Sequence, residues 1–356
     1  MTTVEKIVEI IGDYREEDIR LGYNTRIDCE HVNKWLTQFN KSDRDFLAEQ
    51  LHYMLPKTYL NKKKFLSIMA TTLEKISINL GYKEISDFLN ETRFLNCNQM
   101  GSSQKEFLKL MDVFLREKYN RPISSCGTKG VKFWYYMDDI LASGATFYNN
   151  IKLEISKFGN EKFMKSDIKI ISAYVILHTW GVRNIKYKIK SEMNSTIAKK
   201  IVFYRKIDIQ NDPRLYFNRN PIFNHIYPLH SEIGDQVLEF IEDTINCQYD
   251  FRNEEYAFRN KQYPRKEKFF SSTENRIRYE NILLKKRFEI MQKIKSAPAG
   301  SLRPLGMTNP SNKTLGTGTH FFTWRNISNT CPLAFWWDIN GWHPLFPRKM
   351  GRLNLF

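Results

Sequence analysis

The sequence predicts an α/β protein with a doubly wound parallel sheet, a helical N-terminal region and an irregular C-terminal extension. Residues 94–178 alternate short apolar strands with amphipathic helices, which is the order typical of a doubly wound sheet. The last of these strands, Ile168 to His178, is an almost continuous apolar run, as expected of a strand buried on both faces. Residues 1–92 have helical periodicity, whereas the residues beyond 300 are rich in Gly, Pro, Asn and Trp and show little.

The N-terminal region is expected to contain at least two helices. Ser42 is a suitable N-cap for a helix that Pro56 closes, and Asp45 occupies the third position of that helix. A second helix is expected to start at Asn61, with apolar residues at helical spacing, and to end at Gly81. These apolar positions predict a core and no chemistry.

The elements that follow place the sheet in the middle of the chain. Predicted strands are Phe94–Cys97, Val131–Met137, Ile168–His178 and Ile201–Ile207. One predicted helix passes through Phe107 and Phe114, and a second ends at Gly159. A third spans Ser231–Cys247, and a fourth buries Ile282, Leu283, Ile290 and Ile294. We therefore expect a helical region at 1–92, an α/β core at 93–250, and a basic helical and Trp/Asn-rich region at 251–356 whose last segment closes the site.

The composition restricts the class of protein. A hydrophobic share of 42% and an aromatic share of 14% predict a folded globular chain. We find no apolar stretch long enough to span a membrane and no signal peptide, and the five scattered cysteines lack a CxxC pair. This pattern predicts reduced thiols in a cytoplasmic protein, and the dispersed histidines predict no zinc site.

The formal charge of +16 allows two interpretations. A basic surplus raises affinity for polyanions such as nucleic acid, nucleotides or an acidic partner. It also suits a solubilising surface, because the charge is spread along the chain and no nucleic-acid-binding motif accompanies it.

The segment Trp134 to Thr146 is the best candidate for chemistry. It places Asp138 and Asp139 after a hydrophobic strand, where open α/β sheets bind their ligands. Two adjacent acids can accept hydrogen bonds from the 2- and 3-hydroxyls of a ribose. The small residues Ala142, Ser143, Gly144, Ala145 and Thr146 allow backbone N–H groups to approach a phosphate, at the start of a helix that favours an anion.

This pattern resembles the diphosphoribosyl-binding motif of type I phosphoribosyltransferases. The resemblance implies a type I phosphoribosyltransferase-like fold, in which Asp138 and Asp139 hold the ribose diol and residues 142–146 hold the 5-phosphate. It also implies Mg²⁺ as a cofactor, with Asp138 and Asp139 as the residues at the metal, and an oxocarbenium-like reacting centre. In the same family the loop after the first strand contacts pyrophosphate, and Gly101, Ser102 and Ser103 occupy that position. A plain N-cap is the alternative role for these three residues.

The C-terminal segment carries a second resemblance. Leu315-Gly316-Thr317-Gly318, the block from Phe322 to Leu333 and the tryptophan-rich block from Trp336 to Arg348 look like the closing segment of a phosphoribosyltransferase-like effector family associated with bacterial anti-phage conflict systems and retrons. Arg325, Asn326 and Asn329 are candidates for contacts to a base or a phosphate. A tryptophan-rich core with turn asparagines is the competing interpretation.

Tyr136-Met137-Asp138-Asp139 is also the catalytic tetrapeptide of reverse transcriptases, whose paired acids bind two magnesium ions. A polymerase would continue from the acids into a hairpin strand, whereas Ser143 to Thr146 favour a helix start. A third hypothesis is a non-catalytic module that binds a nucleotide, or binds nucleic acid through the basic residues 259–295.

The favoured hypothesis is a phosphoribosyltransferase-like effector that acts at the anomeric carbon of a ribose phosphate or nucleotide. By resemblance it would be a toxin in anti-phage defence, with partners such as a reverse transcriptase and its RNA or DNA, and no membrane.

Overall fold

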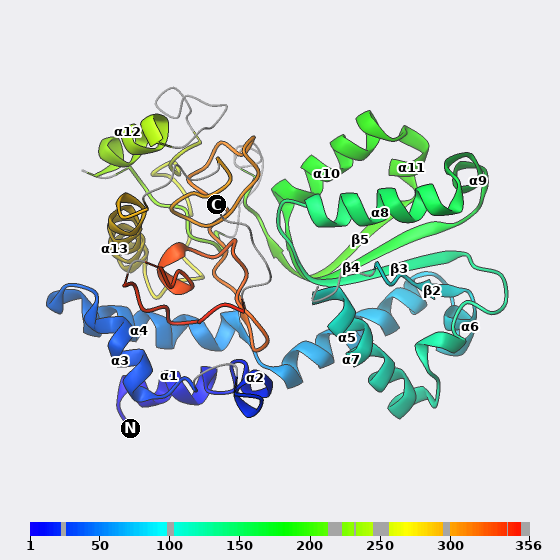
Figure 1. Ribbon diagram of the computed structural model, residues 1–356, viewed down its shortest axis with the longest axis horizontal. Coiled ribbons are helices and arrows are strands. Elements are labelled where there is room, and N and C mark those ends of the chain that lie inside the picture. The colour runs from blue at the N-terminus through cyan, green and yellow to red at the C-terminus, as the bar shows by residue number, and fades with distance from the viewer. Residues whose placement is uncertain are drawn as a thin grey trace. The chain divides into compact units, whose positions relative to one another are not determined.

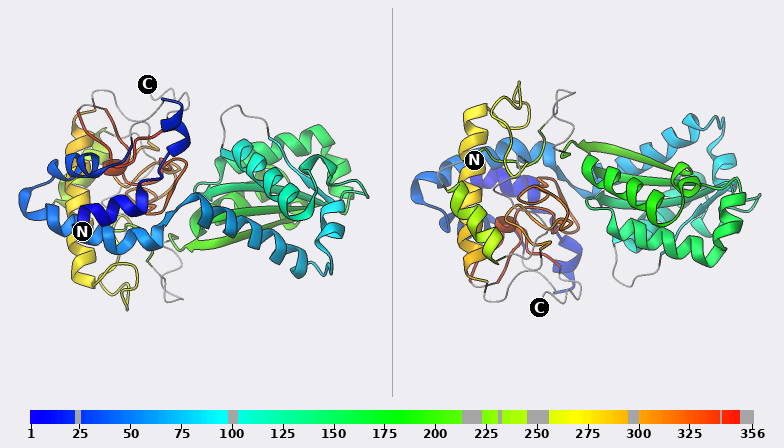
Figure 2. Two further views of the ribbon diagram at one scale, coloured as in Figure 1. Left: turned by 90° about the horizontal axis from the view of Figure 1, so that it is seen from below. Right: turned by 90° about the horizontal axis from the view of Figure 1, so that it is seen from above.

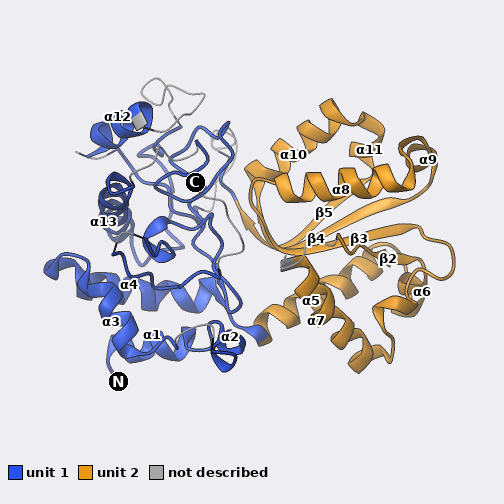
Figure 3. Ribbon diagram, viewed as in Figure 1, with its two compact units in different colours: residues 1–62, 210–356 blue, residues 63–209 orange. Residues whose placement is uncertain are grey.

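The computed structural model describes residues 1–22, 26–97, 103–212, 223–230, 233–244, 256–294, 300–339 and 341–349. The chain forms two compact units (Figure 3). Unit 1 comprises Met1–Lys62 and Gln210–Phe356, and unit 2 comprises Lys63–Ile209. Unit 2 is therefore one uninterrupted stretch, whereas unit 1 is assembled from two stretches that are remote in sequence.

Unit 2 contains a parallel sheet whose strands follow one another in the order β2-β3-β4-β5. The strands are β2 (Thr92–Phe94), β3 (Phe133–Leu141), β4 (Lys169–His178) and β5 (Ile201–Ile209). Each neighbouring pair is parallel. The carboxyl ends of all four strands consequently lie at one edge of the sheet, from which the connecting segments depart.

Helices cover both faces of this sheet. They are α5 (Lys62–Asn79), α6 (Ile85–Asn90), α7 (Ser103–Tyr119), α8 (Ala145–Phe158), α9 (Asn160–Lys165), α10 (Thr179–Glu192) and α11 (Ser195–Lys199). Helices α8 and α10 lie over one face, and α5 and α7 lie over the other (Figures 1 and 2). This arrangement confirms the predicted α/β fold class with a doubly wound parallel sheet.

The alternation of side chains along β3 divides the core of unit 2 into two halves. Trp134 and Tyr136 pack in the cluster that contains Phe147 of α8. Tyr135 and Met137 line a small space on the other face, together with Met111 of α7. Because successive strand residues point to opposite faces, an aromatic run in β3 supplies large apolar surface to both layers. Full burial of each such side chain stabilises the fold by roughly 1.5–3 kcal/mol.

Unit 1 joins N-terminal helices to a C-terminal segment with little regular structure. Its elements are α1 (Thr3–Ile11), α2 (Glu16–Arg20), α3 (Cys29–Thr37), α4 (Lys41–Thr58), β1 (Tyr59–Leu60), α12 (Gly234–Thr244), α13 (Thr273–Gln292), β6 (Phe322–Thr323) and the short 3-10 helix η3 (Leu333–Phe335). Strand β1 pairs in parallel with β6. The indole of Trp35 donates to the carbonyl of Ala334 at 2.8 Å, which anchors the C-terminal segment to α3.

Several features differ from the sequence-based expectations. The first strand of the sheet is Thr92–Phe94 and not Phe94–Cys97. The compact units do not coincide with the regions 1–92, 93–250 and 251–356, because β1 pairs with β6 while α5 belongs with the sheet. The N-cap of α4 is Asn40 and not Ser42, and the helix continues past Pro56 to Thr58. Proline removes one backbone hydrogen bond, but Leu55 and Thr58 are buried, so packing stabilises this last turn.

The basic residues described at 259–294 are divided between surface and core. Arg265, Lys266 and Lys268 are exposed. Arg259, Arg276 and Arg287 are buried. Burial also lowers the pKa of Arg287 to about 9. Helix α13 buries Leu283 and Ile290 as expected, but Ile282 and Ile294 are only half-buried. Sequence composition alone could not distinguish these structural arginines from surface ones.

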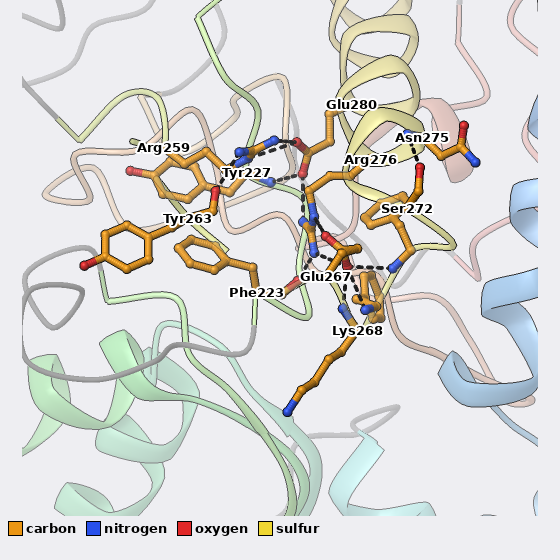
Figure 4. A network of polar contacts seen from close by, with 12 residues as sticks. Phe223, Tyr227, Arg259, Tyr263, Glu267, Lys268, Ser272, Asn275, Arg276 and Glu280 are labelled. Carbon is orange, nitrogen blue, oxygen red and sulfur yellow. Dashed lines mark hydrogen bonds and ion pairs between the residues drawn. The ribbon is translucent and has the colours of Figure 1, made fainter. Parts of the chain in front are cut away.

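A buried network of ion pairs surrounds Arg276 (Figure 4). Its guanidinium contacts Glu267 and donates to Glu280 at 3.1 Å, and Arg259 approaches the other oxygen of Glu280 at 3.3 Å. Glu280 also accepts the backbone N–H of Tyr227 at 3.0 Å. Burial raises the pKa of Glu280 although both arginines oppose this. The network ties α13 to the loops that precede it.

No helix among the described residues is long and apolar enough to cross a membrane.

We expect Glu280→Gln to destabilise unit 1 by about 3–5 kcal/mol, because it keeps the side-chain shape but leaves two buried guanidinium groups short of an anion. Denaturant unfolding followed by tryptophan fluorescence measures this. The matched control is Glu289→Gln, whose pair with Lys286 is partly exposed and is expected to contribute less than about 1 kcal/mol. Equal effects of the two variants would contradict the prediction.

Candidate active site

Strand β3 continues beyond the point where the sequence predicted its end. It includes Asp138 and Asp139 and ends at Leu141, which is in register with Leu177 of β4. Residues 142–144 then form a short loop, and α8 begins at Ala145. The strand is longer than Val131–Met137 predicted because Ile140 and Leu141 are apolar and pair with β4. Residues 138–146 are thus a strand, a loop and a helix, with a parallel neighbour.

The two aspartates are each fixed by the backbone of the following residue. The N–H of Asp139 donates to Oδ1 of Asp138 at 3.0 Å, and the N–H of Ile140 donates to Oδ1 of Asp139 at 2.9 Å. Both carboxylates therefore lean along the chain toward the carboxyl edge of the sheet. Both residues are half-buried. A carboxylate has about four lone-pair positions, so one backbone hydrogen bond leaves it able to accept others.

The loop between β3 and α8 exposes the start of a helix to an anion. Gly144 has φ +80°, a left-handed conformation that favours glycine, and it offers α8 no side-chain cap. The N–H of Ala145 has only a long contact of 3.4 Å to Oγ of Ser143, and Thr146 is exposed. The first N–H groups of a helix lack partners within it, so this loop can supply donors to a phosphate.

Helix α10 supports the loop through a very close backbone approach. A Cβ atom added to Gly181 would lie 1.7 Å from the carbonyl oxygen of Ala142, and one added to Gly144 would lie 3.0 Å from Cβ of Ile185. Nδ2 of Asn184 lies 3.5 Å from the carbonyl oxygen of Ser143. Neither Gly181 nor Asn184 is among the candidate residues predicted from the sequence. The available signal was a glycine inside a helix, where it costs about 1 kcal/mol relative to alanine unless packing requires it.

The loop after β2 starts at the same edge of the sheet, beside the end of β3. The side chain of Gln104 holds its first residues, accepting the N–H of Cys97 at 3.1 Å and donating to the carbonyl of Leu95 at 3.3 Å. Burial raises the pKa of the Cys97 thiol to about 11, so this thiol is not a nucleophile at neutral pH.

The predicted pyrophosphate residues follow Cys97 in the sequence. Gly101 and Ser102 lie outside the described residues, and so does the side chain of Ser103, the first residue of α7. Their contact with pyrophosphate remains a prediction.

The C-terminal candidates belong to unit 1, whereas Asp138 to Thr146 belong to unit 2. Arg325, Asn326 and Asn329 are half-buried. The amide of Asn326 brackets the backbone of Lys349, with Oδ1 accepting its N–H at 2.9 Å and Nδ2 lying 3.3 Å from its carbonyl oxygen. That contact gives Asn326 a structural use. The tryptophans of this segment at 324, 336 and 337 are buried, as a tryptophan-rich core requires.

The two carboxylates at the end of β3 suit magnesium, which completes its coordination with water and substrate, better than they suit a metal ion whose ligands all come from the protein. Asp138 and Asp139 offer carboxylate oxygens, which Mg²⁺ prefers. Within the described part of the chain, no group of three or more His, Cys, Asp or Glu side chains is arranged to hold a metal ion. Magnesium commonly keeps several waters and binds through one or two carboxylates together with substrate phosphates, so two carboxylates suffice.

Unit 1 contains a separate cavity of about 530 Å³. Its lining includes Phe39, Asp43, His230, Ile277, Asn281, Ile282, Lys285, Lys286 and Glu289. Several of its charged groups are already paired: Lys286 with Glu289, Asp43 with Arg278, and His230 with Asp235. Neighbouring side chains therefore already balance much of the charge that lines this cavity.

The parallel sheet, the paired aspartates and the loop before α8 define a phosphoribosyltransferase-like class of protein. A model of the PRTase-CE family matches residues 32–348, and the chain belongs to this phosphoribosyltransferase-like family. The match includes most of both units. Searches of curated proteins and of solved structures each gave no significant match.

We expect Gly181→Ala to displace the loop at 142–144, because the new Cβ would overlap the Ala142 carbonyl. Overpacking of this kind costs about 1–3 kcal/mol. Hydrogen exchange of the amides at 142–148 should become faster while the strands stay protected. Lys190→Ala, on the exposed face of the same helix, is the control. Unchanged exchange in the Gly181 variant would show that the close approach is unimportant.

Proposed function

We propose that unit 2 binds the 5-phosphate and the diol of a ribose and promotes reaction at its anomeric carbon. The observation that carries this proposal is the strand, loop and helix at 138–146 in a member of the PRTase-CE family. The substrate class is a phosphoribosyl diphosphate or a nucleotide. The reaction class is transfer or cleavage at the glycosidic centre.

The phosphate would occupy the start of α8. Residues 142–146 bring small side chains and backbone N–H groups to this point, and the helix N-terminus carries a partial positive charge. Such a terminus stabilises an anion by about 0.3–1 kcal/mol at an exposed site and by up to about 2 kcal/mol when partly buried. Fixing the phosphate also orients the sugar, which lowers the entropic cost of the reaction.

Asp138 and Asp139 would accept the 2- and 3-hydroxyl protons in hydrogen bonds. When the bond from the anomeric carbon to diphosphate breaks, its electron pair leaves with diphosphate and positive charge develops on the sugar. The carboxylates stabilise that charge electrostatically. The nucleophilic atom of the acceptor then bonds to the anomeric carbon, and the proton of that atom is released to solvent.

Magnesium is part of this proposal, with Asp138 and Asp139 as the residues that hold it. When bound, the ion neutralises charge on the diphosphate and so makes it a better leaving group.

The polymerase hypothesis does not fit the geometry of residues 138–146. A polymerase needs a hairpin after the paired acids, whereas here β3 leads through a loop into α8, and β4 is parallel to it. A module that binds a nucleotide without catalysis would differ from an enzyme because it would release no diphosphate or base.

We expect Asp138→Asn with Asp139→Asn to weaken binding of 5-phosphoribosyl 1-diphosphate roughly 10- to 100-fold. At each position a neutral hydrogen bond of about 0.5–1.5 kcal/mol replaces a charge-assisted one of about 1.5–3 kcal/mol. Calorimetric titration in the presence of magnesium measures this, and circular dichroism checks the fold. Asp167→Asn, an exposed aspartate in the same unit, is the matched control.

Unchanged affinity in the double variant would overturn the proposed site. Tight binding by the wild type without release of diphosphate or base, across a panel of nucleotides and base acceptors, would favour a binding module. Incorporation of deoxynucleotides on a primed template would favour a polymerase.

We further propose that the chain is a toxic effector of bacterial anti-phage defence, partnered by a reverse transcriptase and its RNA or DNA. The support is the resemblance of the segment from Leu315 to Arg348 to effectors of conflict systems and retrons.

Expression of the wild-type chain with its genomic neighbours is expected to reduce plaque formation by phage, and the Asp138→Asn, Asp139→Asn variant is expected to lose this effect. Plaque counts and growth curves measure it, with the Asp167→Asn variant as control. Equal protection by the double variant, or none by the wild type, would contradict the effector role.

A further inference from the structure

One face of α10 presents basic and aromatic side chains in a single stripe. Arg183, Lys186, Tyr187 and Lys190 follow the spacing i, i+3, i+4, i+7 and are all exposed. Tyr187 has 73% of its surface exposed, although an aromatic side chain of this size is usually buried at least in part. Residues three and four apart on a helix have Cβ atoms about 5–6 Å from one another, so these four form one continuous surface. We call them the α10 stripe.

The opposite face of α10 fixes the stripe relative to the candidate site. Ile185 and Ile189 are buried in the core of unit 2, and Gly181 touches the loop at Ala142. The first residue of the stripe is therefore within one turn of the backbone that supports the phosphate loop. Helix α10, which carries the stripe, lies over the same face of the sheet as α8 (Figure 1). The helix is about 21 Å long at 1.5 Å per residue.

Acidic residues are few in this part of the sequence. Between Arg183 and Lys206 the sequence contains one acid, Glu192. Its carboxylate already accepts the hydroxyl of Tyr148 at 2.7 Å and lies 3.9 Å from Lys188, which is not part of the stripe. Lys199 and Lys206, from α11 and β5, are also exposed. Of the arginines at 259–294, Arg259, Arg276 and Arg287 are buried and cannot contribute to such a surface.

We propose that the α10 stripe binds a single-stranded nucleic acid and leads its terminal nucleotide to the site at the end of β3. Closely spaced cations attract the phosphates of a polyanion, and an exposed aromatic ring between them can stack on a base. Stacking on Tyr187 requires an unpaired base, and the anomeric carbon of a nucleotide is reached by an enzyme only when its base is outside a duplex. The second half of this proposal rests on the proposed function.

The test is fluorescence anisotropy with a labelled, 5′-phosphorylated single-stranded oligonucleotide at several salt concentrations. Lys186→Ala with Lys190→Ala is expected to weaken binding about tenfold at moderate salt and to reduce the slope of log K against log salt by about 1.4, at about 0.7 per lost phosphate contact. Tyr187→Phe should bind like the wild type, and Tyr187→Ala should bind about tenfold more weakly, because it loses the stacking ring.

The matched control is Lys162→Ala with Lys165→Ala, which removes two exposed lysines from α9 in the same unit. If the control and the stripe variant lose equal affinity for the oligonucleotide, the loss is explained by net charge alone and the proposal is overturned. Equally tight binding of duplex DNA, or of an acidic polypeptide such as polyglutamate, would also overturn it. An unchanged affinity in Tyr187→Ala would remove the argument for single strands.

Two further measurements separate this proposal from the proposed function. The stripe variants should bind 5-phosphoribosyl 1-diphosphate as tightly as the wild type, whereas the Asp138→Asn, Asp139→Asn variant should still bind the oligonucleotide through the stripe. If the aspartate variant keeps its affinity for phosphoribosyl diphosphate while the stripe variants lose the oligonucleotide, the proposed function fails and the nucleic-acid surface stands. If the stripe variants lose both ligands, the stripe is part of the small-molecule site and the proposal fails.

Discussion

The candidate site depends on the parallel register between β3 and β4. The pairing runs from Phe133 with Lys169 to Leu141 with Leu177, past both aspartates. It determines where each strand leaves the sheet, and so where Ala142 meets Gly181. It also assigns Trp134 and Tyr136 to the α8 face and Tyr135 and Met137 to the α5 and α7 face. A slip by one residue would exchange these faces, so the core and the position of the acids are specified together.

Unit 1 is stabilised in a different way, because much of its C-terminal segment lacks helices and strands. Buried backbone groups need partners, and here side chains supply many of them. The indole of Trp336 donates to the carbonyl of Cys331 at 2.7 Å, Arg303 donates to the carbonyl of Thr314 at 2.7 Å, and Gln38 exchanges hydrogen bonds with the backbone of His343. The buried tryptophans of this segment are thus core residues, in line with the interpretation of a tryptophan-rich core.

The sequence predicted features that depend on nearby residues. Apolar runs located β3, β4 and β5, and the small residues at 142–146 located the loop and the start of α8. It could not predict features that depend on residues far apart in the chain. This second group contains three features: the pairing of β1 with β6, the burial of Arg276 beside Glu267 and Glu280, and the close contact between Gly181 and the loop at Ala142. The sequence shows a glycine at position 181, but only the packing against Ala142 explains why a larger residue would not fit there.

The division of the chain into two units affects the order in which the units can fold during synthesis. Unit 2 consists of residues 63–209 alone, so all of its strands have been synthesised before the second half of unit 1. Tyr59 and Leu60 must wait for Phe322 and Thr323 to complete their pairing. On the ribosome, the sheet and the loop at 142–144 can therefore form early, while the N-terminal helices lack the segment that covers them. An interrupted chain that ends soon after β5 would already contain every residue of the proposed ribose-phosphate site, without a completed unit 1.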